Sequence, residues 1–214
     1  MKRPIFLLFL ITFSISVFAQ KEATWWYFGN NAGISFTGTG GAPVVQTNGK
    51  MNNAEGVASI ANSKGGLLFY TDGEFVFTKN HTQMTNGSGL KGHNSSTQSA
   101  VIVQQPVRSN RYYIFTVDQE WGNNGFQYSI VDTSLNGGLG QVIQKNVVLL
   151  SKTAEKVAAV KHANKVDTWV VAHGANDNNF YVYILNSVGI SSTPVVTAVG
   201  PVWSTSDKGY SKGY

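Results

Sequence analysis

The residues best placed for chemistry are polar side chains at the ends of predicted strands. Asp72 ends the apolar run in "GLLFYTDGE", and His93, Asn94 and Gln98 belong to "GHNSSTQSA", which leads into the next apolar run. A carboxylate, an imidazole and two amides can together hydrogen-bond a small polar ligand. We therefore predict a binding group formed by Asp72, His93, Asn94 and Gln98, with no catalytic and no metal-binding residues.

An acidic residue at the end of a strand also has a structural explanation. Its carboxylate can accept hydrogen bonds from backbone N–H groups and so cap the turn. Asp118 stands at the same place after a later strand, and His173 stands near that place after a third. Because each repeat must form the same turn, this recurrence favours turn capping over ligand binding at Asp72.

Other reaction chemistries find little support in the residue types. Cysteine is absent, which excludes thiol catalysis, thiolate metal sites and lipid attachment through cysteine. The histidines lack the spacing of a zinc site, and there is no G-x-S-x-G motif. We predict no cofactor. The alternative to a non-enzymatic protein is a glycan-active or other hydrolase in which Asp72, Asp118 and Glu155 meet in one cleft.

A repeated pattern of strand pairs predicts how these residues are positioned. Segments 55–73, 98–118 and 155–174 each contain an apolar run, a polar turn and a second run. With the strand-like runs that follow, each unit of roughly 40 to 60 residues holds about four strands, as in a β-propeller blade. Runs such as "YYIFTV" and "FYVYIL" are almost wholly apolar, which indicates burial on both faces. We predict an all-β fold of propeller-like antiparallel blades, with a jelly-roll or immunoglobulin-like sandwich as the alternative.

The expected domain organisation follows from this repeat. "AEKVAAVKHA" could form a short helix by propensity, but its place in the repeat predicts a strand. About three blades and one N-terminal hairpin do not close a ring, so we expect an incomplete ring, truncated at its C-terminus. The expected segments are a signal peptide (1–19), a hairpin and connection (20–53), and blades over 54–214, at about 54–97, 98–153 and 154–203.

The N-terminus predicts export. Lys2 and Arg3 precede an apolar run (5–18), and Val17 and Ala19 occupy the positions that a signal peptidase reads. The run is shorter than the roughly 20 residues that span a bilayer, so we expect cleavage after Ala19 and no membrane span afterwards. A net charge of +5 without a run of Lys or Arg argues against nucleic acid as a partner. We expect a protein that is secreted or held at the outer cell surface, with the periplasm as an alternative.

A set of motifs resembles one family. The motifs are "WYFGNNAGISF", "EGVASIANSKGGLLFYTDG", "GLKGHNSSTQSAVIVQQP", "YYIFTVD", "YSIVDTSLNGGLG" and "EKVAAVKHAN". Over about residues 25–200 the chain resembles the N-terminal β-propeller region of secreted Bacteroidetes proteins that carry gliding-motility-associated, type IX secretion C-terminal sorting domains. The resemblance implies export to the cell surface or the medium, and it supplies no catalytic residues. We expect the missing blades and the sorting domain in a longer parent protein.

Together these patterns predict a recognition or scaffold module without catalysis, whose partner is a surface glycan or a protein. Aromatic rings bear on the glycan, because their faces stack on sugars. Trp25, Trp121 and Trp203 fall in loop-like contexts where their rings would be exposed, whereas Trp169 falls in a predicted core strand.

Overall fold

The computed structural model describes residues 21–202, which form strands, short 3₁₀ segments and connecting loops. The expectation of an all-β fold with antiparallel sheets is confirmed. Over this range, no helix has the length and hydrophobicity needed to cross a membrane. The 3₁₀ segments are η1 (Lys21–Ala23), η2 (Thr39–Gly41) and η3 (Asn136–Gly138).

The strands occur in one group of three followed by groups of four. The strand predicted over "AEKVAAVKHA", in place of a helix, is confirmed as β12. The bounds are β1 (Trp25–Tyr27), β2 (Gly33–Ser35), β3 (Val44–Gln46), β4 (Ala58–Ala61), β5 (Leu67–Thr71), β6 (Phe75–Thr78), β7 (Gln83–Ser88), β8 (Ala100–Gln104), β9 (Arg111–Val117), β10 (Phe126–Asp132), β11 (Gln141–Leu150), β12 (Thr153–Lys161), β13 (Thr168–Gly174), β14 (Asn179–Leu185) and β15 (Val195–Ala198).

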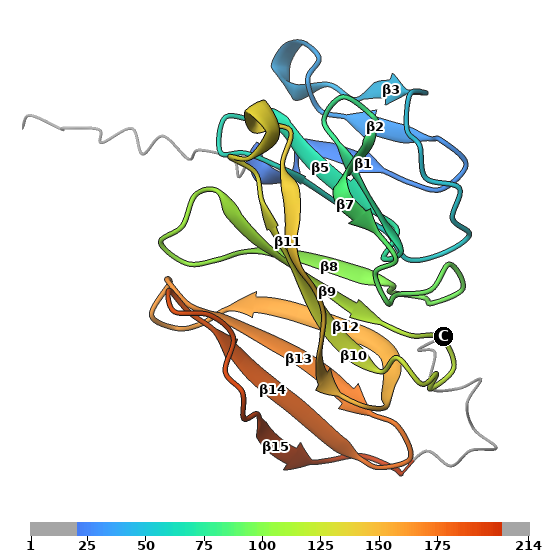
Figure 1. Ribbon diagram of the computed structural model, residues 1–214, viewed down its shortest axis with the longest axis vertical. Coiled ribbons are helices and arrows are strands. Elements are labelled where there is room, and N and C mark those ends of the chain that lie inside the picture. Colours follow the sequence, from blue (N-terminus) through green and yellow to red (C-terminus); the bar gives the residue numbers. More distant parts are fainter. Residues whose placement is uncertain (1–20, 203–214) are drawn as a thin grey trace, which may run out of the picture.

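Within each group, consecutive strands pair antiparallel, so every group is a meander (Figure 1). The groups β4–β7 and β8–β11 join through a parallel contact between Thr85 of β7 and Gln141 of β11. The result is an eight-stranded sheet in the order β4-β5-β6-β7-β11-β10-β9-β8. This sheet curves back on itself until its edge strands β4 and β8 are also neighbours, which gives it a nearly closed, barrel-like form.

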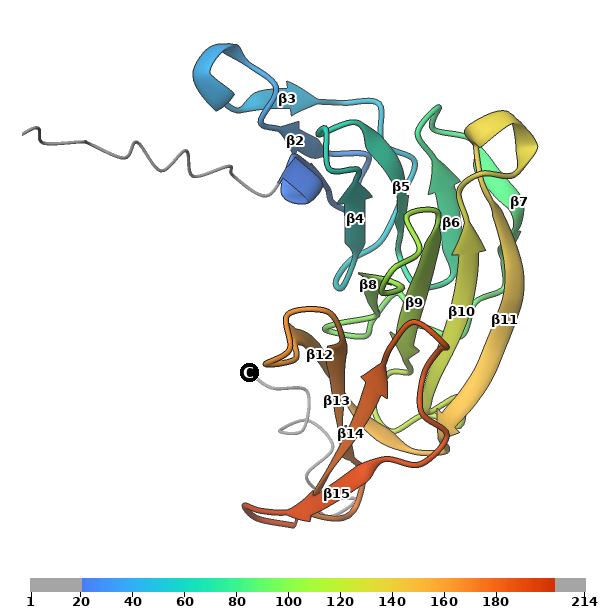
Figure 2. The ribbon, with the colours of Figure 1, turned by 90° about the vertical axis from the view of Figure 1, so that its left-hand side faces the viewer.

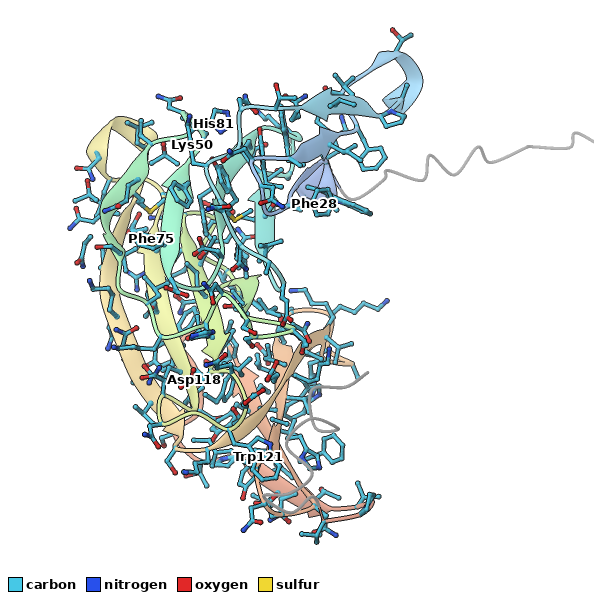
Figure 3. All side chains as sticks on the ribbon, turned by 90° about the vertical axis from the view of Figure 1, so that its right-hand side faces the viewer. Phe28, Lys50, Phe75, His81, Asp118 and Trp121 are labelled. Atoms are coloured by element: carbon cyan, nitrogen blue, oxygen red, sulfur yellow. The ribbon has the colours of Figure 1, made fainter. Side chains whose placement is uncertain are left out.

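The groups follow one another along an arc from β1–β3 to β12–β15 (Figure 2). Their first strands are neighbours, since β4 contacts β8 and β8 contacts β12. The turns between strands lie on two opposite sides of the arc. We call one of these sides the first-turn end, because it holds the turns between first and second strands (62–66, 105–110 and 162–167). The opposite, second-turn end holds the turns between second and third strands (72–74, 118–125 and 175–178). The first-turn end faces the viewer in Figure 2, and the second-turn end does so in Figure 3.

Strand β9 is buried on both faces, as its continuous apolar run predicts. Ile114 and Phe115 point to opposite faces because side chains alternate along a strand, and both are fully buried. Ile114 belongs to the hydrophobic cluster of Phe69, and Phe115 belongs to the cluster of Tyr183. One strand therefore contributes to two cores, one inside the curved sheet and one against β12–β15.

Strand β13 is buried on one face only. Val170 and Ala172 are buried in the cluster shared with β9, whereas Trp169 and Val171 are partly exposed. The expectation that Trp169 is a core residue is wrong for this reason, since its ring lies on the outer face beside His162, at 4.9 Å between centroids. The difference follows from position, because β12–β15 is the last described sheet of the arc.

The N-terminal segment forms a three-stranded sheet, in which β1 and β2 pair as a hairpin and β3 pairs with β2. Tyr27 stacks on Tyr70 at 4.5 Å, which joins this sheet to β5. The expected exposure of Trp121 is wrong, since the side chain is only 5% exposed. Trp203 lies outside the described residues.

Alanine substitutions test the burial of β9 on both faces. Ile114→Ala and Phe115→Ala are expected to lower the free energy of unfolding by about 2 to 5 kcal/mol each, because each leaves a cavity in a different core. Val171→Ala, on the outer face of β13, should cost about 1 kcal/mol or less. Urea unfolding of the three variants measures this. The two-core description fails if Ile114→Ala costs no more than Val171→Ala.

Candidate functional site

Asp72 caps the turn that ends β5. Its Oδ1 accepts hydrogen bonds from the N–H groups of Glu74 (2.9 Å) and Phe75 (2.7 Å). The turn needs glycine at position 73, where φ is +90° and a Cβ atom would collide with the side chain of Ser99. The Asp72 carboxylate, which the sequence predicts to bind a ligand, thus accepts hydrogen bonds from neighbouring backbone N–H groups.

His93 and Asn94 approach this turn from the segment that we call the polar loop (residues 89–99). The Ser99 hydroxyl donates a hydrogen bond to the carbonyl of Asp72 (2.7 Å) and accepts one from the N–H of His93 (3.1 Å). The N–H of Asn94 donates to the carboxylate of Glu74 (2.9 Å). The structure therefore brings Asp72, His93 and Asn94 together, but mainly through their backbone groups.

Gln98 lies where the polar loop meets β12. Its Oε1 accepts a hydrogen bond from the N–H of Val157 (3.3 Å). Glu155, also on β12, is fully buried. Its carboxylate accepts hydrogen bonds from the N–H groups of Thr97 (2.8 Å) and Glu120 (2.7 Å). One buried carboxylate thereby joins the polar loop, the β9–β10 loop and the first strand of the last sheet.

The recurring acidic position is real, but its third member is Asp177 and not His173. Asp118 accepts hydrogen bonds from the backbone N–H groups of Gln119 and Asn124 (2.9 and 3.0 Å). Asp177 accepts one from the N–H of Asn179 (2.8 Å). His173 lies within β13 and packs edge-on against a phenylalanine ring of β14. Asp72 and Asp118 directly follow β5 and β9, whereas Asp177 is the third residue after β13, so alignment on the strand end missed it.

Asp72, Asp118 and Glu155 all bind backbone N–H groups at the second-turn end, the side on which Figure 3 labels Asp118 and Trp121. Asp72 serves the β5–β6 turn, Asp118 serves the β9–β10 loop, and Glu155 binds both that loop and the polar loop. Across residues 21–202, no three His, Asp or Glu side chains form a group that could hold a metal ion. What the arrangement does chemically is satisfy buried N–H donors and fix the positions of neighbouring loops.

Burial raises the pKa of the Asp72 carboxyl above its usual range, and the hydrogen bonds from Phe75 and Glu74 offset this only in part. The folded protein therefore binds the proton more tightly than the unfolded chain does. The contribution of this group to stability is present below the unfolded pKa and is lost as the pH rises through the folded pKa.

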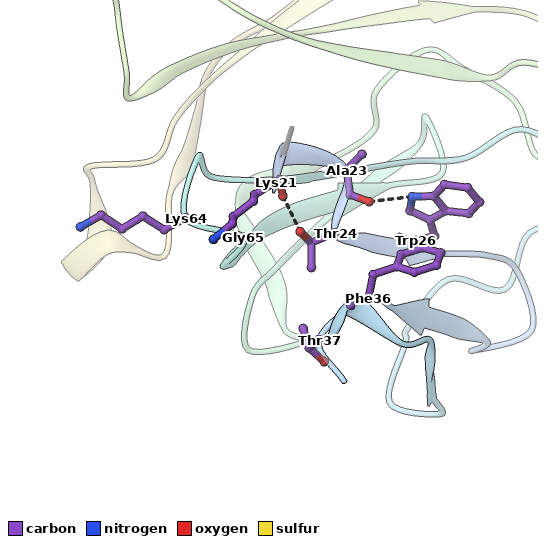
Figure 4. A pocket seen from close by; sticks show the side chains of 9 residues that line it. Lys21, Ala23, Thr24, Trp26, Phe36, Thr37, Lys64 and Gly65 are labelled. Carbon is purple, nitrogen blue, oxygen red and sulfur yellow. Dashed lines mark hydrogen bonds between the residues drawn. The ribbon is translucent and has the colours of Figure 1, made fainter. Parts of the chain in front are cut away.

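The cavities of the described chain include a set at the first-turn end, away from the polar loop. One of about 610 Å³ lies outside β1–β3 and holds two aromatic rings and two lysines. Figure 4 shows Trp26 and Phe36 on one side of it and the amino groups of Lys21 and Lys64 on the other. Nothing in the sequence pattern singles out either lysine.

Two further cavities continue along the same end. One of about 500 Å³ is lined by Glu22 of η1, Tyr112 of β9 and Lys161 of β12. The other, of about 400 Å³, also contacts Lys161 and adds Arg108 and Lys165 from the neighbouring turns. Basic side chains thus border all three cavities, of which the second and third share Gln104 and Lys161.

Comparison with family models, with curated proteins and with solved structures found no match to this chain. Function is therefore argued from the geometry.

Removal of the buried carboxylate tests the joining role of Glu155. Glu155→Ala is expected to lower the free energy of unfolding by about 2 to 4 kcal/mol, because two N–H donors lose their acceptor. Glu155→Gln keeps one acceptor oxygen and should cost less. Thermal and urea unfolding give both values. Equal stability of wild type and Glu155→Ala would contradict the joining role.

The raised pKa of Asp72 gives a second prediction. Asp72→Asn keeps an oxygen acceptor for the turn but cannot ionise. Its free energy of unfolding, relative to that of the wild type, should therefore increase between pH 4 and pH 7. Unfolding curves of both proteins across this range measure the difference. A difference that is independent of pH, or that decreases, would show that burial does not penalise the Asp72 carboxylate.

Proposed function

We propose that the chain is part of an exported β-propeller that acts as a recognition or scaffold module and not as an enzyme. The observation that supports this most directly is the exposure of apolar side chains on the first and last sheets of the arc, β1–β3 and β12–β15. Each end sheet packs its inner face on a neighbouring sheet and leaves an apolar outer face exposed. Apolar faces of this kind on a soluble protein mark surfaces that another structure covers.

The outer face of β12–β15 is the larger of the two. Pairing registers place its residues on adjacent strands, since Val160 lies opposite Trp169, Val171 opposite Val182, and Val182 opposite Val195. Val160 and Val195 are each 59% exposed. The residues on this face are Ala158, Val160, Trp169, Val171, His173, Phe180, Val182, Ile184, Val195 and Thr197.

The outer face of β1–β3 has the same character. Trp26 lies opposite Ile34, and Ile34 lies opposite Val45. On the outer face of β12–β15, a further four-stranded sheet would bury the exposed side chains as the inner face is already buried, whereas the outer face of β1–β3, with Trp26, stays open to a ligand. Additional blades of a longer parent protein would supply such sheets and extend the arc towards a ring, which is the fold that the repeat and the family resemblance predict.

The absence of catalysis in this proposal is supported by the carboxylates. Asp72, Asp118 and Glu155 accept hydrogen bonds from backbone N–H groups, and these contacts account for their positions. A glycosidase needs two carboxyl groups on either side of one bond, roughly 5 to 9.5 Å apart, in a cleft open to the substrate. These three residues instead hold backbone N–H groups of the β5–β6 turn, the β9–β10 loop and the polar loop.

Lysine substitutions test whether other sheets cover the outer face of β12–β15, which we call the end face. If other sheets cover it, the chain alone should self-associate or bind a hydrophobic dye, and Val160→Lys combined with Phe180→Lys should reduce both. Val188→Lys is the matched control, because Val188 is 93% exposed in the β14–β15 turn and is not on this face. Light scattering and dye fluorescence measure the effect. A monomeric wild type that binds no dye would contradict the proposal.

Export is tested separately at the N-terminus. Cleavage after Ala19 is expected to give a mature protein that begins at Gln20. Mass spectrometry of the protein recovered outside the cytoplasm identifies this residue. Retention of residues 1–19 on the recovered protein would show that the segment is not a cleaved signal peptide.

A further inference from the structure

Basic and acidic residues are distributed unequally between the first-turn end and the second-turn end. At the first-turn end, including η1 and the starts and ends of the strands there, basic residues outnumber acidic ones. At the second-turn end the excess is acidic. The first-turn residues are Lys21, Lys64, Lys79, Arg108, Arg111, Lys161 and Lys165 against Glu22, Asp132 and Asp167, whereas the second-turn residues are Glu55, Asp72, Glu74, Asp118, Glu120, Glu155 and Asp177 against Lys91, Lys152 and Lys156.

The acids of the first-turn end have local partners. The Asp132 carboxylate accepts hydrogen bonds from Asn110 and Ser134. Although burial acts in the opposite direction, these bonds and the nearby Arg111 lower the pKa of Asp132 below its usual range. Asp167 accepts a hydrogen bond from the side chain of Asn164 (2.7 Å). The bonds to Asp132 favour its ionised form, so they leave its charge in place. The seven basic and three acidic side chains of this end still give it a net charge of +4, which favours an anionic partner.

An aromatic platform lies at one edge of this basic surface. Trp26 and Phe36 meet edge to face at 5.3 Å and 72°, and they are 48% and 38% exposed. The indole N–H of Trp26 donates a hydrogen bond to the carbonyl of Ala23 (2.8 Å), which fixes the orientation of the ring. Lys21 and Lys64 line the same cavity. A ring fixed in place and flanked by cations suits a flat or ring-shaped ligand that carries negative charge.

We propose that the first-turn end binds an anionic polysaccharide. One sugar ring stacks on Trp26, and the carboxylate or sulfate groups of neighbouring sugars pair with Lys21 and Lys64 on the other side of the cavity. The chain of sugars then continues across the neighbouring cavities towards Lys161, Arg108 and Lys165. This inference rests on the proposed recognition role and specifies its ligand.

The aromatic content of the surface favours a glycan over single-stranded nucleic acid. Sites for single strands place successive aromatic rings along a basic groove, one for each stacked base. Here the exposed Trp26 and Phe36 belong to the first cavity. The second cavity has Tyr112, whose ring is buried and therefore cannot stack on a base. A single stacking platform followed by separated cations matches a charged glycan better.

Calorimetric titration of the mature protein tests the site. The probes are alginate oligosaccharides for carboxylates, dextran sulfate for sulfates, neutral dextran, and oligothymidylate. Binding to at least one anionic glycan is expected, weakening with added salt, with no binding to dextran. No binding to either anionic glycan would overturn the inference, as would tighter binding to oligothymidylate. Whichever of alginate and dextran sulfate binds more tightly identifies the anionic group.

Single substitutions distinguish binding at the Trp26 cavity from nonspecific electrostatic attraction between the protein and the glycan. Trp26→Ala should weaken glycan binding about tenfold, and Lys64→Ala, in an exposed turn, should weaken it several-fold. Glu22→Gln should strengthen it. Lys152→Ala is the matched control at the second-turn end and should have no effect. If Trp26→Ala does not fold, Lys64→Ala and Glu22→Gln decide the outcome. Equal effects of Lys64→Ala and Lys152→Ala would overturn the inference.

The result of the glycan-binding experiment is independent of the test of self-association and dye binding at the end face. Failure of glycan binding with an end face that still self-associates would reject the ligand and leave the recognition module in place. Glycan binding by a chain that neither self-associates nor binds dye would support the ligand and reject the expected neighbouring sheets.

Discussion

The constraint on which the structure depends is that its central strands are apolar on both faces. A strand such as β9, with Ile114 in one core and Phe115 in the other, must lie between two layers of side chains. The groups of strands satisfy this requirement by following one another along an arc, each covering a face of the next. The sheets at the two ends have a neighbour on one side only, which explains their exposed apolar faces.

Polar groups at the second-turn end fix how these layers sit on one another. The polar loop touches the β5–β6 turn through Ser99 and the last sheet through Gln98, while Glu155 binds two loops from within β12. Hydrogen bonds have strict geometry and hydrophobic contacts do not. The buried acids therefore define the register of a stack that its apolar cores alone would leave adjustable. With the acids used in this way, the basic first-turn end is the surface that we propose for an external ligand.

Much of the fold could be predicted from local pattern, and the errors have specific causes. The strand at β12 was predicted in spite of its helical propensity, because the repeat carries more information than any single residue. Trp121 was predicted to be exposed because it lies in a loop, yet the loop folds over its ring. The acidic position of the third repeat was assigned to His173, because Asp177 is the third residue after its strand, whereas Asp72 and Asp118 come directly after theirs.

By itself, the sequence determined the all-β fold class, the repeat of strand pairs and the recurrence of acids after second strands. The alternation of side chains along a strand and the residue preferences of turns are local properties, so they can be recognised in short segments. Only the tertiary structure decided which groups meet. It joined Glu155 to Thr97 and Glu120, and it placed Lys64 beside Lys21 and Trp26. These residues are far apart in the chain, and their proximity depends on how the sheets stack. Stacking follows from the packing of whole faces, which no short stretch of sequence specifies.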